Sequence, residues 1–288
     1  MAQITAAMVK ELREMTGAGM LECKKALVEA DGDMDAAVDV LRTRGLAQAA
    51  KKAGRATNEG RVCAIVDGNA GAVCQVNCET DFVALTDKFQ DYANSFTAAV
   101  LTNKPENVEA LLESEVDGVK VQDALTEAIH IIGENMQISN FARVEIEGTG
   151  ALVPYLHMNG KIGVLVAFNF DNAATAEDAR FQAMGKDVAM QIAATSPVSL
   201  DENSVPEDIR EHEFGIYKAQ AAESGKPEAI QEKIATGRMA KFYKESCLVN
   251  QDFVKNPDIT VADHIAAAAK EIGDNIKVVS FARIALGE

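Results

Sequence analysis

The side chains that most often do chemistry in proteins are few in this chain of 288 residues, and they do not form a catalytic set. Four histidines are scattered along the sequence: His130, His157, His212 and His264. Cys74 and Cys78 lie on one face of a predicted strand with Val76 between them, but no histidine or third cysteine lies nearby to complete a zinc site. One interpretation of these cysteines is small apolar residues of a core. A thiol oxidoreductase that uses Cys74 and Cys78 is the enzyme alternative.

The sequence also lacks the motifs of nucleotide-binding enzymes and hydrolases. No glycine-rich loop GxxxxGK[ST] occurs, and no GxGxxG follows a predicted strand. The run GAGMLE that begins at Gly17 lacks the third glycine and lies between predicted helices, which indicates a turn. HExxH and GxSxG are absent as well. We therefore expect a protein that is not an enzyme, with no catalytic residues and with neither metal nor cofactor.

Composition and charge narrow the class of partner. The chain has 28 Lys and Arg against 44 Asp and Glu, a formal charge of −16, and so acidic a surface repels a phosphate backbone. We therefore expect no direct nucleic-acid binding. No charge-free apolar run approaches the roughly 18 residues of a membrane span, and the amphipathic start MAQITAAMVKEL is unlike a signal peptide. These features predict a soluble, cytoplasmic protein with reduced thiols and no membrane contact.

Three short helices are predicted over residues 1–45. Apolar residues recur there at helical spacing, Gly17 and Gly19 separate the first helix from the second, and Asp33 is typical of the cap of the third. So small a bundle has little core of its own, which favours a docking module. The small, polar and locally basic stretch 47–60 predicts a linker.

Two β-hairpins follow, each ahead of a helix. Alternating apolar residues flank the turn-forming run Asp67-Gly68-Asn69, and a second hairpin is predicted over residues 152–168. The two hairpin and helix units align at an offset of 92 residues, which matches Gly71 with Gly163. At an offset of 140 residues, the run IGENMQISNFAR from Ile132 aligns with IGDNIKVVSFAR. These alignments predict a duplicated core.

The second copy is longer than the first. The difference between the two offsets is 48 residues, which places an insertion near 198–245. Two helices are predicted there, roughly 205–223 and 228–242, with the turn SGKP at 224–227 between them. Because their apolar stripe is thin, we expect an antiparallel helical hairpin that projects from the body and contacts another molecule.

The two copies differ most at one loop. Asn77 is followed by CETDFVALTDKF and the equivalent Asn169 by FDNAATAEDARF, so Asp81 and Phe82 stand where the second copy has alanines. Residues that serve the fold should agree between copies, so a ring and a carboxylate at this tip predict a wedge. The alternative is a helix cap, in which Thr80 or Asp81 caps the following helix and Phe82 packs on its first turn.

Four runs of the sequence resemble one family: TGAGMLECKKALVEADGD at 16–33, NCETDFVA at 77–84, HMNGKIGVLV at 157–166 and SGKPEAIQEKIATGRMAKF at 224–242. Together they look like the bacterial elongation factor Ts family, the partners of elongation factor Tu, and the likeness spans nearly the whole chain. The resemblance implies an α+β fold in named parts. Residues 1–54 would form a ubiquitin-associated-like three-helix module with the start of a linker. Residues 55–148 and 149–288 would be the two copies of a duplicated α+β core, with an antiparallel helical hairpin inserted in the second at about 198–245.

The resemblance also implies an activity and its residues. Members promote GDP release from elongation factor Tu, a translational GTPase, during translation elongation. One loop, formed by Thr80, Asp81, Phe82 and Val83, would displace Mg²⁺ and open the phosphate site. Phe82 would act as the wedge, and Asp81 would hold the loop in place. Two further surfaces would bind the partner: Leu12, Met20 and Leu21 in the N-terminal module, and His157, Met158, Gly160, Lys161 and Ile162 in the second core copy. The alternative for the first set is the core of the bundle, which is the commoner fate of apolar residues at helical spacing.

Such an activity needs no bond chemistry, which agrees with the absence of catalytic motifs. A scaffold that docks a GTPase without exchange activity is the alternative from the binding class, and the projecting hairpin could also contact a second copy of the chain. Family members often continue beyond the second Phe-Ala-Arg-Ile strand into a further helix, whereas this chain stops at Glu288. We therefore carry over no contact from that helix.

Overall fold

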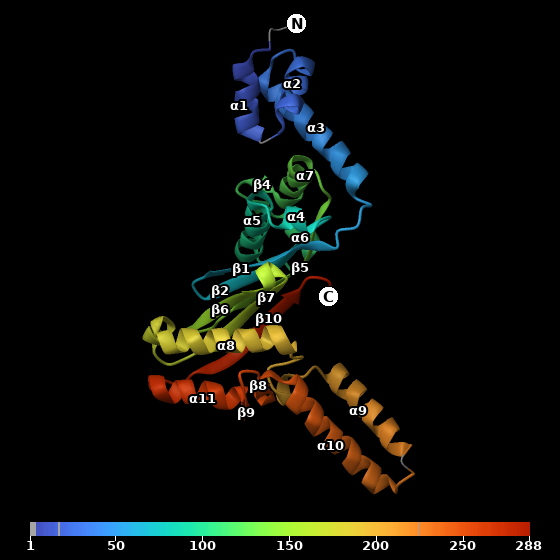
Figure 1. The fold of residues 1–288 in the computed structure, drawn as a ribbon, viewed down its shortest axis with the longest axis vertical. Helices are drawn as coiled ribbons and strands as arrows, with labels where there is room; N and C mark the ends of the chain where they lie inside the picture. The colour runs from blue at the N-terminus through green and yellow to red at the C-terminus, as the bar shows by residue number, and fades with distance from the viewer. Residues whose placement is uncertain (1–3, 17, 224) are drawn as a thin grey trace.

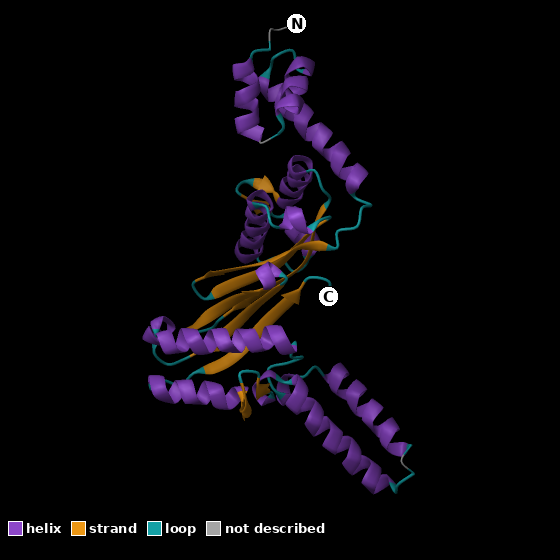
Figure 2. Ribbon diagram, viewed as in Figure 1, coloured by secondary structure: helices purple, strands orange, loops and turns teal. Residues whose placement is uncertain are grey.

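The computed structural model describes residues 4–16, 18–223 and 225–288 of the chain. It is a mixed α+β protein with helices at the N-terminus and small antiparallel sheets (Figures 1 and 2). The turn predicted at Gly17 and the first residue of the turn predicted at 224–227 lie outside the described residues. Among the residues that are described, no helix has both the length and the apolar character needed to cross a bilayer.

Three helices form a small bundle at one end of the molecule (Figure 1). They are α1 (Ala6–Thr16), α2 (Met20–Glu29) and α3 (Met34–Lys52). Asp33 caps α3, since its carboxylate accepts a hydrogen bond from Ala36 N at 2.9 Å. Eight buried side chains make the core of the bundle: Val9, Leu12, Ala18, Cys23, Ala26, Leu27, Ala37 and Leu41.

Helix α3 is longer than the sequence predicts. The linker prediction for 47–60 is wrong over its first six residues, because α3 continues to Lys52. This stretch is rich in alanine, the best helix former, and it packs along α7 (Val121–Ile132). Lys52 Nζ donates to the carbonyl of Ile129 at 3.1 Å, and a Cβ at Gly45 would lie 3.5 Å from His130 Cβ. The contact with α7 therefore stabilises the last part of α3, residues 47–52, which lacks an apolar period of its own.

The first sheet consists of β1 (Glu59–Asp67), β2 (Ala70–Cys78) and β5 (Met136–Glu145), in the order β1-β2-β5 and all antiparallel. Its hairpin turns at Gly68 and Asn69 as predicted, with Gly68 at a φ of +54°. Helices α5 (Asp87–Asn103) and α7 cover the outer face of this sheet. The shorter elements of this half are α4 (Asp81–Ala84), α6 (Val108–Glu113), β3 (Glu115–Val116) and β4 (Val119–Lys120).

The second sheet consists of β6 (Gly150–His157), β7 (Ile162–Asn169) and β10 (Lys277–Ala285), in the order β10-β7-β6. Helices α8 (Ala179–Thr195) and α11 (Val261–Ile272) lie on its outer face. There the rings of Phe168 and Phe181 pack edge to face, with their centroids 5.3 Å apart. The shorter elements of this half are η1 (Met158–Gly160), η2 (Ala173–Glu177), η3 (Glu202–Ser204), η4 (Leu248–Asn250), β8 (Asp252–Phe253) and β9 (Asn256–Thr260).

The inner faces of the two sheets pack on each other, so the layers run helix, sheet, sheet, helix (Figure 2). Four buried side chains fill the interface: Val62, Val73, Leu165 and Ile284. Two glycines allow the close approach, because a Cβ at Gly163 would lie 2.4 Å from Val62 Cγ1 and a Cβ at Gly71 would lie 3.2 Å from Leu165 Cδ1. The residues matched at the offset of 92 thus serve the contact between the sheets.

Helices α9 (Glu207–Ala222) and α10 (Glu228–Ser246) lie side by side and extend away from the sheets, at the end of the molecule opposite the N-terminal bundle (Figure 1). Their buried residues are Ala221, Ala235 and Met239. The two helices therefore rest mainly on each other.

We expect Gly163→Ala to lower the free energy of unfolding by about 1–3 kcal/mol, because the new methyl group overlaps Val62 Cγ1. In a Val62→Ala background the same change should cost less, since the colliding methyl group is gone. Urea titration of the four proteins measures both effects. Gly215→Ala, inside α9 with open space around its Cα, is the control that should not lower stability. Equal costs of Gly163→Ala in the two backgrounds would contradict the close contact.

Candidate functional site

The loop of residues 79–85 leaves the end of β2 and forms one short helix before α5 begins. Thr80 caps this helix, α4, and its hydroxyl accepts from Val83 N at 3.4 Å. Helix α5 has a separate cap, Thr86, whose hydroxyl accepts from Phe89 N at 3.3 Å. The cap interpretation is therefore right for Thr80, but the helix it caps is α4 and not the long helix that follows.

Phe82 is 80% exposed. It does not pack on the first turn of the helix, so the interpretation of this ring as a staple is wrong. Leu85, three residues further on, is 57% exposed, whereas Val83 is partly buried against the first core. The 79–85 loop therefore carries two large apolar side chains into solvent on a backbone that is capped and hydrogen-bonded.

Asp81 lies in the first turn of α4, where a negative charge is favoured by the helix dipole. Its carboxylate is exposed and makes no side-chain hydrogen bond or ion pair within the described parts of the chain. In the free protein, the loop is instead held by Thr80 and by Glu134, which follows α7.

The predicted contact residues of the N-terminal bundle do not share one surface. Met20 and Leu21 are 46% and 65% exposed, side by side at the start of α2. Leu12 is fully buried in the core of the bundle, and its predicted contact with a partner stays a prediction. Apolar residues at helical spacing pack between helices, and Leu12 faces α2 and α3 while Leu21 faces solvent.

The turn between β6 and β7 contains three consecutive residues in the left-handed region, Met158, Asn159 and Gly160, with φ of +47°, +55° and +87°. Left-handed backbone is unfavourable for a long side chain such as methionine, and strain of this kind clusters at functional sites. Met158 is 68% exposed, and the imidazole of His157 is exposed with its Nδ1 2.9 Å from Tyr155 Oη.

Three predicted residues of this turn are less accessible. Gly160 is buried beneath Arg61, and a Cβ there would lie 2.5 Å from Arg61 Cγ, so the turn requires glycine here. Its predicted contact with a partner stays a prediction. Ile162 is partly buried against the second core. The ammonium group of Lys161 donates to Glu59 Oε2 at 2.5 Å.

The turn and the 79–85 loop lie at the same end of the paired sheets. Glu59, the partner of Lys161, stands opposite Cys78 in the first sheet, and Cys78 immediately precedes the loop. Helix α3 meets the same half of the molecule, with His130 Nδ1 within 3.0 Å of Gln48 Oε1. Helix α3 thus links the N-terminal bundle to the half of the molecule that carries the 79–85 loop.

The five cysteines are free and buried. Cys74 and Cys78 both belong to the first core, and burial raises the pKa of both thiols, that of Cys78 to about 12. Residues four apart on a strand are separated by about 13 Å, too far for a disulfide. Within the described residues, no group of three His, Cys, Asp or Glu is arranged to hold a metal ion.

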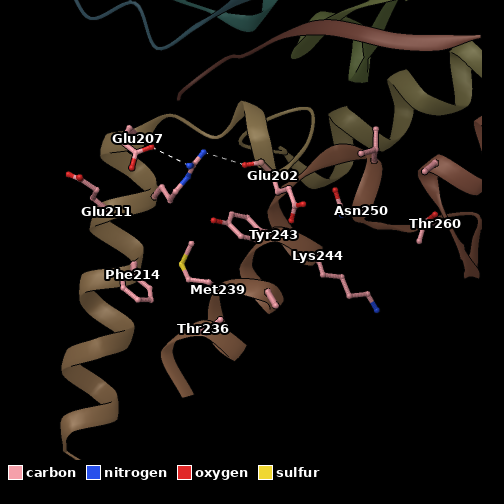
Figure 3. A pocket seen from close by; sticks show the side chains of 14 residues that line it. Glu202, Glu207, Glu211, Phe214, Thr236, Met239, Tyr243, Lys244, Asn250 and Thr260 are labelled. Atoms are coloured by element: carbon pink, nitrogen blue, oxygen red, sulfur yellow. Dashed lines mark hydrogen bonds and ion pairs between the residues drawn. The ribbon is translucent and has the colours of Figure 1, made fainter. Parts of the chain in front are cut away.

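A separate pocket lies at the base of α9 and α10 (Figure 3). Phe214 and Met239 face it, and Arg210 pairs with Glu207 at 3.2 Å on its rim. None of the predicted site residues lines this pocket.

The sequence interpretation missed the residues that support the loop, above all Glu134 and Asn135. The signal was present, because the repeat aligns IGEN with IGDN and so keeps an acidic residue followed by asparagine in both copies.

Comparison with known proteins defines the class. Residues 79–288 match the family model described as elongation factor TS. The elongation factor Ts of Trichlorobacter lovleyi is 50% identical over 99% of this chain and 93% of its own length. Those of Clostridium novyi and Desulfovibrio desulfuricans are each 46% identical over 99% of this chain, and over 93% and 99% of their own lengths.

The chain therefore belongs to the elongation factor Ts family, whose members are exchange factors rather than enzymes. It is a nucleotide exchange factor for elongation factor Tu in translation elongation.

We expect the thiols of the native protein to react with a thiol reagent at neutral pH far more slowly than those of the urea-unfolded chain. All five are buried, and only the thiolate reacts. Because the pKa of Cys78 is raised, its reactivity should keep increasing with pH beyond the ordinary thiol pKa of about 8.5. Stopped-flow labelling measures the rates. Rapid labelling of Cys74 or Cys78 at pH 7 would revive the oxidoreductase alternative.

Proposed function

We propose that the residues Thr80, Asp81, Phe82 and Val83 promote GDP release by displacing Mg²⁺ from elongation factor Tu and opening its phosphate site. Phe82 inserts into the nucleotide domain of the partner, and the carboxylate of Asp81 accompanies it at the tip of the loop. GDP and Mg²⁺ are held by charge-assisted contacts, so movement of the groups that carry them weakens nucleotide binding.

The observation that carries this proposal is the exposure of Phe82 on an ordered backbone. Burying a phenylalanine ring is worth about 1.5–3 kcal/mol, and here 80% of the residue remains in water. Thr80 fixes the start of the helix that bears the ring. Insertion into a partner recovers the burial energy without the entropic cost of ordering a flexible loop.

The surface of Met20 and Leu21 supplies a second contact with the same partner, and the exposed side chains of His157 and Met158 supply a third. Both surfaces are exposed and apolar in part; the first lies on the N-terminal bundle and the second on the turn between β6 and β7. Contacts at separate places let the binding energy of the whole interface act on the phosphate site.

Exchange then follows from thermodynamic coupling. A factor that weakens the binding of GDP to its partner is itself weakened by nucleotide to the same degree. Incoming GTP therefore expels the factor, and neither step needs a covalent intermediate or a resident cofactor.

We further propose the division of the chain that the repeat predicts: a ubiquitin-associated-like module at 1–54, core copies at 55–148 and 149–288, and a hairpin inserted near 198–245. Two pairs of helices support it. The bounds of α5 and α8 differ by 92 residues at both ends, and those of α7 and α11 differ by 140. Self-association through α9 and α10 stays a prediction.

We expect Phe82→Ala to slow the factor-stimulated release of GDP from elongation factor Tu by about tenfold or more, while binding to the nucleotide-free partner is largely kept. The measurement is release of a fluorescent GDP at saturating factor, repeated over a range of Mg²⁺ concentrations. Val254→Ala, an exposed apolar residue of the second half, is the matched control and should behave as wild type. An unchanged rate for Phe82→Ala would overturn the wedge and favour a docking scaffold.

We expect the double variant Met20→Ala/Leu21→Ala to raise the concentration of factor needed for half-maximal GDP release by about tenfold, with little change in the maximal rate. Its thermal unfolding should match wild type, because both side chains are exposed. Leu12→Ala is the contrasting variant: loss of a fully buried leucine should destabilise the bundle by about 2–5 kcal/mol. The same stability loss in the double variant would exclude a surface role.

A further inference from the structure

The first two residues of the 79–85 loop are held by one carboxylate. Glu79 N and Thr80 N both donate to Glu134 Oε2 at 3.0 Å, and the Thr80 hydroxyl donates to Glu134 Oε1 at 2.7 Å. Both oxygens are used, and three donors of the loop meet a single negative charge. Hydrogen bonds to a charged acceptor are shorter and stronger than those between neutral groups.

Glu134 is itself fixed by its neighbours. Gly133 ends α7 in the left-handed conformation, at a φ of +92°, and turns the chain toward the loop. Asn135 N then donates back to Glu79 Oε1 at 2.6 Å, and Asn135 Nδ2 donates to the carbonyl of Arg55 at 2.9 Å. Hydrogen bonds therefore run in both directions between the loop and the end of α7.

Thr80 passes this constraint to the tip. Its hydroxyl proton points at Glu134, which leaves an oxygen lone pair for Val83 N and so sets the cap of α4. Phe82 lies inside that single turn of helix. The direction in which the ring leaves the protein thus depends on a group outside the loop.

We propose that Glu134 is the positioning residue of the 79–85 loop: its carboxylate orients Thr80, and through Thr80 the helical turn that presents Phe82 to the partner. The proposal rests on the function proposed above for Phe82. Glu134 does not touch the partner in this account, and its effect is on the geometry of the ring and not on the contact area.

We call the Glu134 carboxylate with its three loop donors a clamp. The second core copy contains a similar clamp without the wedge, in which the hydroxyl donor is at the position matching Val83 rather than Thr80. Asp274, 140 residues after Glu134, accepts from Asp171 N and Asn172 N at 3.2 Å each and from the Thr175 hydroxyl at 2.5 Å. The loop it holds has alanines at the two positions matching the tip of the first loop. A matched control therefore exists within the same chain.

The test compares Glu134→Gln with Asp274→Asn in the full chain. Each change keeps the shape of the side chain but replaces one accepting oxygen by a donating nitrogen, so each clamp loses hydrogen bonds and charge. We expect Glu134→Gln to lower the maximal rate of GDP release from elongation factor Tu by about tenfold, with a smaller change in half-saturating concentration. Asp274→Asn should leave the maximal rate unchanged, although both variants lose stability to urea.

A second pair of variants reaches the same contact from the loop, in case Glu134→Gln folds poorly. Thr80→Val keeps the shape but removes the hydroxyl and should reproduce the slow release, whereas Thr80→Ser keeps the hydroxyl and should restore it. Amide hydrogen exchange in the free protein gives a readout that needs no partner. The amides of Thr80 and Val83 should exchange faster in Glu134→Gln and unchanged in Asp274→Asn.

Two results would overturn the proposal: a wild-type maximal rate in Glu134→Gln, or an equal loss of rate in Asp274→Asn. Failure of the wedge is distinguishable from failure of the clamp. If Phe82→Ala releases GDP at the wild-type rate, the proposed function of the loop fails, and the hydrogen exchange of Thr80 still decides whether Glu134 orders it. Unchanged protection in Glu134→Gln would then overturn the clamp as well.

Discussion

The close packing of two small sheets is the constraint on which the rest of the molecule depends. A three-stranded sheet with helices on one face leaves its other face apolar, and each sheet here covers the other. Gly71 and Gly163 allow the approach. Because the strand ends are brought together by this contact, a loop from the first sheet and a turn from the second emerge side by side. The proposed contacts of the 79–85 loop and of the turn between β6 and β7 therefore depend on the packing of the two sheets.

Much of the framework could be predicted from the sequence because the core is duplicated, and each copy supports the interpretation of the other. Alternating residues and turn signals located both hairpins, and the two offsets located the helices that cover them. The length of α3 could not be predicted, since residues 47–52 have no apolar period and owe their helical state to α7. Leu12 and Leu21 illustrate the same limit: spacing marks apolar residues, but only the position of the neighbouring helices decides which is buried.

For the 79–85 loop, the sequence indicated the exposed residue Phe82 but not the residue that holds the loop, Glu134. Phe82 is visible because the second copy lacks it. Glu134 is less visible, since an acidic residue after a helix-ending glycine is ordinary on a surface, and its role arises from a contact with residues more than fifty positions earlier. Sequence comparison between copies finds what differs. Residues that both copies share and that support the differing loop, such as Glu134, are recognised only from their contacts in the folded structure.

The sparse packing of α9 and α10 has an evolutionary consequence. Few residues of α9 and α10 are buried and the two helices rest mainly on each other, so the sheets lose little if the pair is shortened, lengthened or deleted. Both ends of the pair return to the same place on the second half, where Val198 N, ahead of α9, donates to the carbonyl of Ser246, the last residue of α10, at 2.8 Å. The pair α9 and α10 thus leaves the second half and returns to it at one place, so its sequence and length can change in evolution with little effect on the sheets.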